Sequence, residues 1–264
     1  MRVKAVACDL DGTLLCSDGS LAERTLAALR AVQRSGALLA ICTARPPRWT
    51  LPVLEQLEQP PVAVCSNGAV VLDLATGREL EVRALPPRAC RTVVARLSAA
   101  LPGGAWAVER AQSFAHEPTY VPAWPVPAGT AVAPIEQLID EPVVKLLLRH
   151  RQHSADAMLS AARRLVGELV EASHSSSSGQ LLEICAPGVS KATALAGLCA
   201  ARGIAREQVI AFGDMPNDLP MLRWAGRGVA VANAHPEVLA AADELTLSND
   251  DGGVAAVLEG LFPA

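Results

Sequence analysis

Two carboxylates follow a short apolar run near the start of the chain. Asp9 and Asp11 stand one residue apart, and Gly12, which permits a sharp turn, comes directly after them. Carboxylates with this spacing can face one crevice and share a hard cation. The alternatives are a solvated loop or part of a calcium loop, but Thr13 and the residues after it lack the further ligand and closing glutamate of a calcium loop. The stretch is therefore predicted to be a chemical site.

Polar residues also follow two later apolar runs. Thr43 ends the run 37–42, and two further carboxylates, Asp214 and Asp218, come soon after the run 208–212. Short apolar runs bounded by turn residues are typical of strands buried on both faces. Ligands of open α/β sheets bind at the carboxyl ends of such strands. These groups are therefore predicted to share one site, although a threonine at a strand end is more often a cap or ladder residue.

A single lysine stands out at the start of a later predicted helix. Lys191 is one of three lysines among the 23 basic residues, and Ser190 before it is a favoured N-cap residue. A lysine ammonium is a compact point charge, whereas arginine is the default cation of this chain. The alternative is an ordinary surface lysine, and taken alone the residue leaves both interpretations open.

Composition excludes several classes of protein. The 264 residues are 51% hydrophobic and 19% charged, which is typical of a globular chain with ample core. A net charge of -4 gives no general attraction to nucleic acid or to an anionic membrane, so neither is expected as a partner. No apolar run is long enough to span a bilayer, and the seven cysteines, an odd number without a C-x-x-C pair, indicate neither zinc nor disulfides. A cytoplasmic protein is expected.

Strand and helix patterns alternate at both ends of the chain, which predicts an α/β protein with a doubly wound parallel sheet. A helix over about 20–35 is predicted to open with a capping box of Ser20 and Glu23, and a hairpin is expected over 69–82. The alternation stops near residue 84 and resumes near 186. The intervening segment is predicted to be an inserted α+β domain with helices over 86–100 and 154–166, strands over 143–148 and 181–185, a Pro-rich loop over 118–134 and a loop over 173–179.

The stretch Asp9-Leu10-Asp11-Gly12-Thr13 resembles the first motif of the haloacid dehalogenase (HAD) superfamily of phosphotransferases. Thr43 and Lys191 match the second and third motifs in order, and the segment 213–218 resembles the fourth at Gly213, Asp214, Asn217 and Asp218. With the insert between the second and third motifs, the whole chain resembles a Cof-type HAD phosphatase with a type 2 (C2B-like) cap. The resemblance implies a Rossmann-like HAD core over 1–83 and 186–264, and an α+β cap domain over 84–185.

The resemblance also implies roles for individual residues. Asp9 would be the nucleophile that forms an aspartyl-phosphate, and Asp11 would be the general acid and base. The metal Mg²⁺ would be held by the carboxylates of Asp9 and Asp214 and the backbone carbonyl of Asp11, with Asp218 orienting its waters. The phosphoryl oxygens would be bound by three further residues, Thr43, Lys191 and Asn217. Candidate contacts of the leaving group, chosen because they flank the expected cleft, are Arg45, Asn67 and Glu183.

The activity implied by the resemblance is the hydrolysis of a small phosphorylated metabolite, such as a sugar phosphate, by a monomer or homodimer. Ion-pumping ATPases of the superfamily carry threonine where this chain has Asp11, and an acid there favours turnover to alcohol and phosphate. A phosphomutase with the same cap type, or a regulator that binds a phospholigand without turnover, remain alternatives. The sequence does not identify the substrate, and the inserted segment is expected to close as a lid that selects it.

Overall fold

The structure is a computed structural model that describes residues 2–57, 59–175 and 180–263. The chain divides into two compact units, the first formed by residues 1–81 and 190–264 and the second by residues 82–189. All four motifs singled out in the sequence lie in the first unit. In the part of the chain that the structure describes, no helix is long and apolar enough to cross a membrane.

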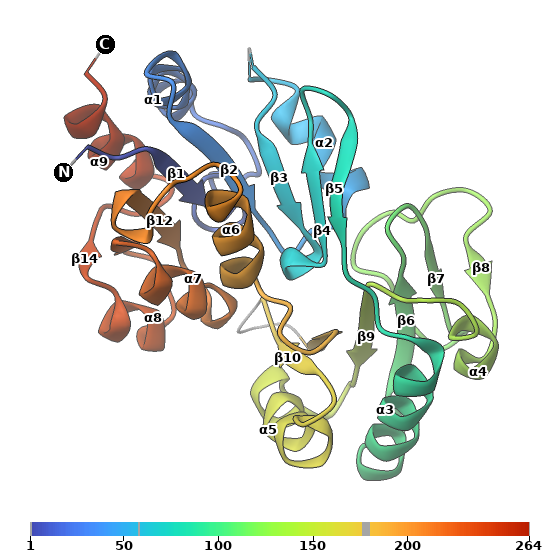
Figure 1. Ribbon diagram of the computed structural model, residues 1–264. Coiled ribbons are helices and arrows are strands. Elements are labelled where there is room, and N and C mark those ends of the chain that lie inside the picture. Colours follow the sequence, from blue (N-terminus) through green and yellow to red (C-terminus); the bar gives the residue numbers. More distant parts are fainter. Residues whose placement is uncertain (1, 58, 176–179, 264) are drawn as a thin grey trace. The chain divides into compact units, whose positions relative to one another are not determined.

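The first unit is built on one sheet with the strand order β14-β13-β12-β1-β2-β3-β4-β5 (Figure 1). Neighbouring strands from β14 to β3 run parallel, and β4 is antiparallel to β3. The strands are β1 (Ala5–Cys8), β2 (Leu38–Cys42), β3 (Val62–Cys65), β4 (Val70–Asp73), β5 (Arg78–Val82), β12 (Val209–Gly213), β13 (Arg227–Ala230) and β14 (Glu244–Leu245).

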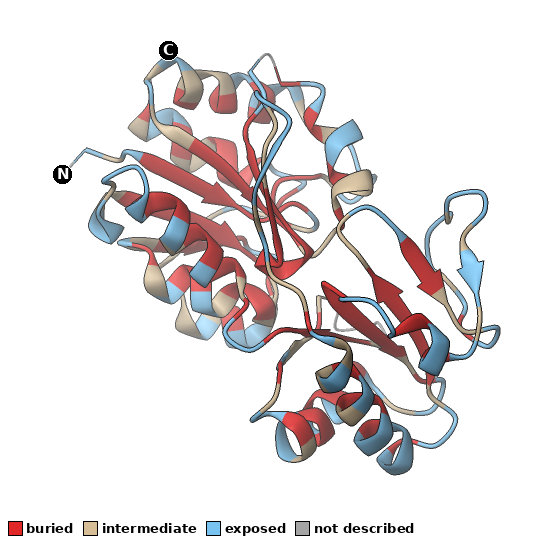
Figure 2. Cartoon of the chain, turned by 45° about the vertical axis from the view of Figure 1, so that its right-hand side comes forward, coloured by how far each residue is buried: buried red, intermediate tan, exposed pale blue. Residues whose placement is uncertain are grey.

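Strand β1 lies near the middle of this sheet because it pairs with β2 on one side and with β12 on the other. Every residue of β1 and β12 is buried, as their apolar runs in the sequence predicted, and every residue of β3 is buried as well (Figure 2). Cys8 is register partner of both Ile41 and Phe212, so three strands end together. The polar residues that follow these strands are therefore delivered to one edge of the sheet.

Helices connect the strands of the first unit, and they include α1 (Glu23–Arg34), α2 (Pro47–Leu54), α6 (Lys191–Ala200), α7 (Leu219–Trp224), α8 (Pro236–Ala241) and α9 (Gly253–Leu261), with short 3-10 turns η1 (Ser66–Gly68), η2 (Arg206–Gln208) and η3 (Pro216–Asp218). Helix α1 packs against α9, and α6 packs against α7 (Figure 1). The predicted capping box of Ser20 and Glu23 is wrong, because Ala22 is the N-cap and makes no side-chain bond. The Ser20 hydroxyl instead donates to Asp18, which satisfies it locally.

The second unit has its own sheet, with the strand order β10-β11-β9-β6-β7-β8. The pairs from β10 to β7 are antiparallel, and β7 pairs with β8 in parallel. Its elements are α3 (Pro87–Ala100), β6 (Ala105–Glu109), β7 (Phe114–His116), β8 (Ala131–Val132), α4 (Ile135–Leu138), β9 (Lys145–Arg149), α5 (Ala155–Val166), β10 (Glu171–Ser173) and β11 (Leu181–Cys185). The predicted loop over 173–179 lies mostly outside the described residues, and its first residue ends β10.

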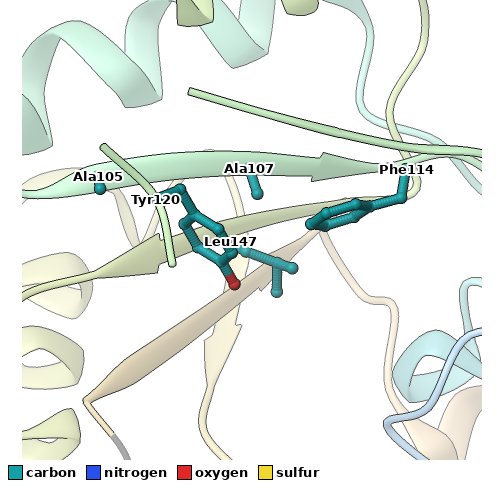
Figure 3. Close-up of a cluster of buried hydrophobic side chains, with 5 residues drawn as sticks. All are labelled: Ala105, Ala107, Phe114, Tyr120 and Leu147. Carbon is teal, nitrogen blue, oxygen red and sulfur yellow. The ribbon is translucent and has the colours of Figure 1, made fainter. Parts of the chain in front are cut away.

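The sheet of the second unit has two different faces. Helix α3 packs on one of them, where the Trp106 indole N–H donates to Ser98 of that helix. On the other face Ala107, Phe114, Tyr120 and Leu147 form a buried apolar cluster together with Ala105 (Figure 3). An inserted α+β unit with its own core is therefore present, and its role as a substrate-selecting cap stays a prediction.

Candidate active site

The site begins where β1 and β12 end. The backbone N–H of Asp9 donates to the Phe212 carbonyl at 3.0 Å, which continues the pairing of the two strands by one residue. Asp214 stands just beyond Gly213, the last residue of β12. Adjacent parallel strands therefore bring together the carboxylates of Asp9 and Asp214, which are 205 positions apart in the sequence.

Lys191 joins this group from the first residue of α6, a helix capped by Ser190 through Thr193. Its Nζ donates to Oδ1 of Asp9 at 2.5 Å and to Oδ1 of Asp218 at 2.7 Å. The ammonium is 1% exposed, so the interpretation as a surface lysine is wrong. A buried charge costs much free energy unless it is paired, and here two carboxylates pair it.

The carboxylates outnumber the ammonium. Burial raises the pKa of Asp9 well above its usual range, and the charge of Asp218 raises it further, although Lys191 acts in the opposite direction. Burial, with the same neighbour, raises the pKa of Asp214 to about 7. Burial lowers the pKa of Lys191, but Asp218 and Asp9 outweigh it, so that this pKa rises. The site thus holds an excess of negative charge that favours binding of a further cation.

The residues present fit a hard divalent metal ion. One carboxylate oxygen from each of Asp9, Asp214 and Asp218 lies within 4.8 Å of the others, and all three residues are buried. The donor set consists of oxygen alone, which suits Mg²⁺. The structure therefore adds the Asp218 carboxylate to the group from which ligands can come, whereas the sequence predicted only that it would orient waters.

Stability without metal is expected to depend on pH. Because the folded-state pKa of Asp214 is about 7 and the value in the unfolded chain is about 4, the folded protein binds more protons between these values. The free energy of unfolding should therefore fall as the pH rises from about 4 to 7. Urea unfolding in excess chelator across this range checks the slope. Asp214→Asn should reduce the slope, although Asp9, whose pKa is also raised, still contributes to it, and an unchanged slope in this variant would contradict the assignment.

Gly12 brings the first motif against the fourth. Its φ of 75° lies in the left-handed region, and a Cβ there would stand 2.5 Å from Oδ2 of Asp214. Thr13 donates its hydroxyl to Oδ1 of the same carboxylate at 3.0 Å. The missing Cβ of Gly12 leaves room for the Asp214 carboxylate, and the Thr13 hydroxyl holds it there, which explains why a glycine and a threonine follow the two aspartates.

Gly12→Ala is expected to lower activity by about tenfold or more, because the new methyl group must displace the Asp214 carboxylate. Gly77→Ala is the matched control, since its φ of 69° is similar but no atom lies within 4 Å of the added Cβ. The control should lose only about 1 kcal/mol of stability from the left-handed backbone. Steady-state kinetics and thermal unfolding of both variants test this. Equal activity of the two variants would mean that contact with Asp214 is unimportant.

Asp11 does not point its carboxylate at this group in the structure. Arg45 donates its Nε to Oδ2 of Asp11 at 2.8 Å and its Nη2 to Oδ1 at 2.5 Å. This two-point contact is a strong form of ion pair. The predicted general acid and the predicted leaving-group contact are therefore partners of each other, and both roles stay predictions.

Thr43, Asn67 and Asn217 gather at the neighbouring strand ends. The Thr43 hydroxyl accepts the backbone N–H of Arg45 at 3.0 Å, so it caps the turn after β2. The Asn217 amide donates to Oδ1 of Asn67 at 3.1 Å. Glu183 is the exception, because it lies in the second unit, where the Lys145 ammonium donates to it at 2.5 Å. Its predicted contact with the leaving group stays a prediction.

Two asparagines outside the predicted set of site residues hold the loop after Asp11. Asn233 donates to the Gly12 carbonyl at 2.8 Å, and the backbone N–H of Asn249 donates to Oδ1 of Asn233 at 3.0 Å. Asn249 also donates its amide to the Leu15 carbonyl at 2.8 Å. The bond between Asn233 and Gly12 joins residues 221 positions apart along the chain, so apolar periodicity and residue spacing do not predict it.

Comparison with known proteins agrees with this architecture. The model of a family described as haloacid dehalogenase-like hydrolase matches residues 6–258. The chain is 28% identical over 263 residues to the 5-amino-6-(5-phospho-D-ribitylamino)uracil phosphatase YitU of Bacillus subtilis (strain 168), covering 97% of each chain. It is 28% identical over 267 residues to the pyridoxal phosphate phosphatase YbhA of Escherichia coli (strain K12), again covering 97% of each chain.

A solved structure shows the same fold. It is a haloacid dehalogenase-like hydrolase from Bacteroides thetaiotaomicron, 27% identical, with a TM-score of 0.77 over 99% of this chain and 100% of that chain. The predicted superfamily, α/β fold class and enzyme class are thereby confirmed. On the family match and this shared fold, the chain belongs to the haloacid dehalogenase-like hydrolases.

Proposed function

We propose that the protein is a Mg²⁺-dependent phosphatase that hydrolyses a small phosphorylated metabolite through an aspartyl-phosphate on Asp9. The observation that carries the proposal is the buried ammonium of Lys191 between Asp9 and Asp218, beside Asp214. Phosphoryl transfer requires a nucleophile, together with a cation and a metal ion that neutralise the phosphoryl charge. Two relatives named as phosphatases of small phosphorylated compounds support the same class of substrate.

In the first step, a carboxylate oxygen of Asp9 attacks phosphorus, and the bond from phosphorus to the leaving oxygen breaks. Asp11 donates a proton to that oxygen, so the alcohol leaves neutral. For this, the Asp11 carboxyl must first leave the two-point contact with Arg45. Lys191, Thr43 and Asn217 are proposed to bind the phosphoryl oxygens as charge develops on them.

In the second step, Asp11 takes a proton from a water molecule, whose oxygen attacks phosphorus. The bond between phosphorus and the Asp9 oxygen breaks, and inorganic phosphate is released. Asp9, Asp214 and Asp218 are the side chains that would hold Mg²⁺, together with the proposed backbone carbonyl of Asp11. The ion would neutralise phosphoryl charge when bound.

The second unit is proposed to act as the cap that selects the leaving group. The four motifs lie outside it, and it has a core of its own. In enzymes that use a lid, closure excludes water and adds contacts to the substrate. Substitutions in this unit are therefore predicted to change relative activity among sugar phosphates more than activity on a small aryl phosphate.

Release of phosphate from an aryl phosphate, with and without Mg²⁺, tests the proposed function. We expect release with Mg²⁺ and its loss in excess chelator, restored when Mg²⁺ is added back. Full activity in chelator would contradict the metal assignment. A mutase would release little phosphate and would interconvert sugar phosphates when given a bisphosphate activator. A regulator would bind phosphate without releasing any from an ester.

A further inference from the structure

A left-handed turn lies beside the phosphate-binding residues. Ser66 and Asn67 have φ angles of 50° and 58°, and Gly68 follows with 98°. Among the described residues these two are the non-glycine positions with positive φ. Side-chain-bearing residues in this region carry strain, and such strain persists where the surrounding structure fixes it, often at functional sites.

The backbone of this turn is tied to the loop that carries Thr43. The N–H of Asn67 donates to the Thr43 carbonyl at 3.0 Å, and the N–H of Ser66 donates to the Arg45 carbonyl at 2.9 Å. A Cβ on Gly68 would lie 2.3 Å from the carbonyl oxygen of Ser190, the residue before Lys191. The turn therefore contacts the loops of the second and third motifs at once.

The side chain of Asn67, in the middle of the turn, reaches the fourth motif. Oδ1 of Asn67 accepts the Asn217 amide at 3.1 Å, and both residues are more than nine-tenths buried. Oδ1 of Asn217 is buried and has no hydrogen-bond partner among the described residues. A buried polar atom without a partner is costly, so the position is suited to a ligand that can bond there.

The orientation of the Asn67 amide sets which atom of the Asn217 amide faces the ligand position. When Asn67 presents its oxygen, Asn217 turns Nδ2 toward it and leaves Oδ1 on the other side. If both amides rotate by half a turn, their mutual bond is kept with donor and acceptor exchanged. In that orientation Asn217 presents the N–H donors of Nδ2 in place of Oδ1. A phosphoryl oxygen accepts hydrogen bonds, so it requires such a donor.

We propose that Asn67 is a positioning residue that orients the Asn217 amide for the phosphoryl group and, through its backbone, sets the spacing to Thr43. This inference rests on the proposed phosphatase function. Asn67 would act on the phosphoryl group through Asn217, whereas the sequence predicted that Asn67 contacts the leaving group directly. The strained turn supplies rigidity, because three motif loops are held to three consecutive residues.

Calorimetric titration of the Mg²⁺-loaded protein with inorganic phosphate tests the proposal. Asn67→Gly removes the amide while glycine accepts the left-handed backbone, so folding is retained. We expect Asn67→Gly and Asn217→Ala each to weaken phosphate binding about tenfold. The double variant should lose no more than either single variant, because the two residues act as one unit. Asn67→Ala, which also strains the backbone, serves as a second variant.

The control is Ser98→Ala, which removes one side-chain hydrogen bond in the second unit. It should bind phosphate as the wild type does. Wild-type affinity in Asn67→Gly, multiplied losses of about a hundredfold in the double variant, or a wild-type protein that binds no phosphate would each overturn the inference. A protein that binds phosphate in this pattern but hydrolyses no phosphoester would refute the phosphatase proposal and leave the positioning role standing.

Discussion

Asp9→Asn is expected to reduce phosphate release by about a thousandfold or more, while the protein stays folded. The amide keeps an oxygen that can accept the hydrogen bond now made by Lys191 at 2.5 Å. It cannot act as the nucleophile that forms the acyl phosphate. Stability is expected to hold or rise, because burial disfavours the ionised Asp9, whose pKa is raised, and because Lys191 keeps its ion pair with Asp218.

Asp250→Asn is the matched control for this experiment. It makes the same chemical change at an exposed carboxylate that accepts from the hydroxyl of Ser17 at 2.6 Å. The control should keep most of the activity. Rates come from phosphate release with an aryl phosphate, and folding from circular dichroism and thermal unfolding. Wild-type turnover by Asp9→Asn would exclude Asp9 as the nucleophile.

Lys191→Met should lower both activity and stability. Methionine nearly matches the length of the side chain but leaves the buried carboxylates of Asp9 and Asp218 without their ammonium. Removing one partner of a buried ion pair costs about 3 to 5 kcal/mol. Loss of the charge that stabilises the phosphoryl oxygens is expected to reduce kcat by about a hundredfold or more.

The control for this substitution is Lys4→Met, since Lys4 is exposed. Urea unfolding and kinetics of the two variants, each with and without Mg²⁺, separate the contributions. Added Mg²⁺ should restore part of the stability of Lys191→Met, because it supplies positive charge to the same carboxylates. If the two variants were equally stable and equally active, the buried bridge would contribute nothing measurable.

Much of the fold could be predicted because its signals are local. The apolar runs before Asp9, Thr43 and Asp214 are strands, and the hairpin over 69–82 and the helix over 86–100 correspond to β4, β5 and α3. Strands β6, β7 and β8 were not predicted. Strands β7 and β8 have only three and two residues, and β8 lies inside the segment expected to be a Pro-rich loop, where it is held by pairing with β7. Such pairing depends on residues distant in the sequence.

The carboxylates that stand at strand ends could be predicted from the sequence, since side-chain type and apolar periodicity are local properties. Tertiary structure alone decided how they are paired. Lys191 joins Asp9 to Asp218 rather than facing solvent, Asp11 is held by Arg45, and Asn67 reaches Asn217 from a left-handed turn. The physical reason is that a buried charge or amide must find its partner wherever packing places one, and packing depends on the whole chain.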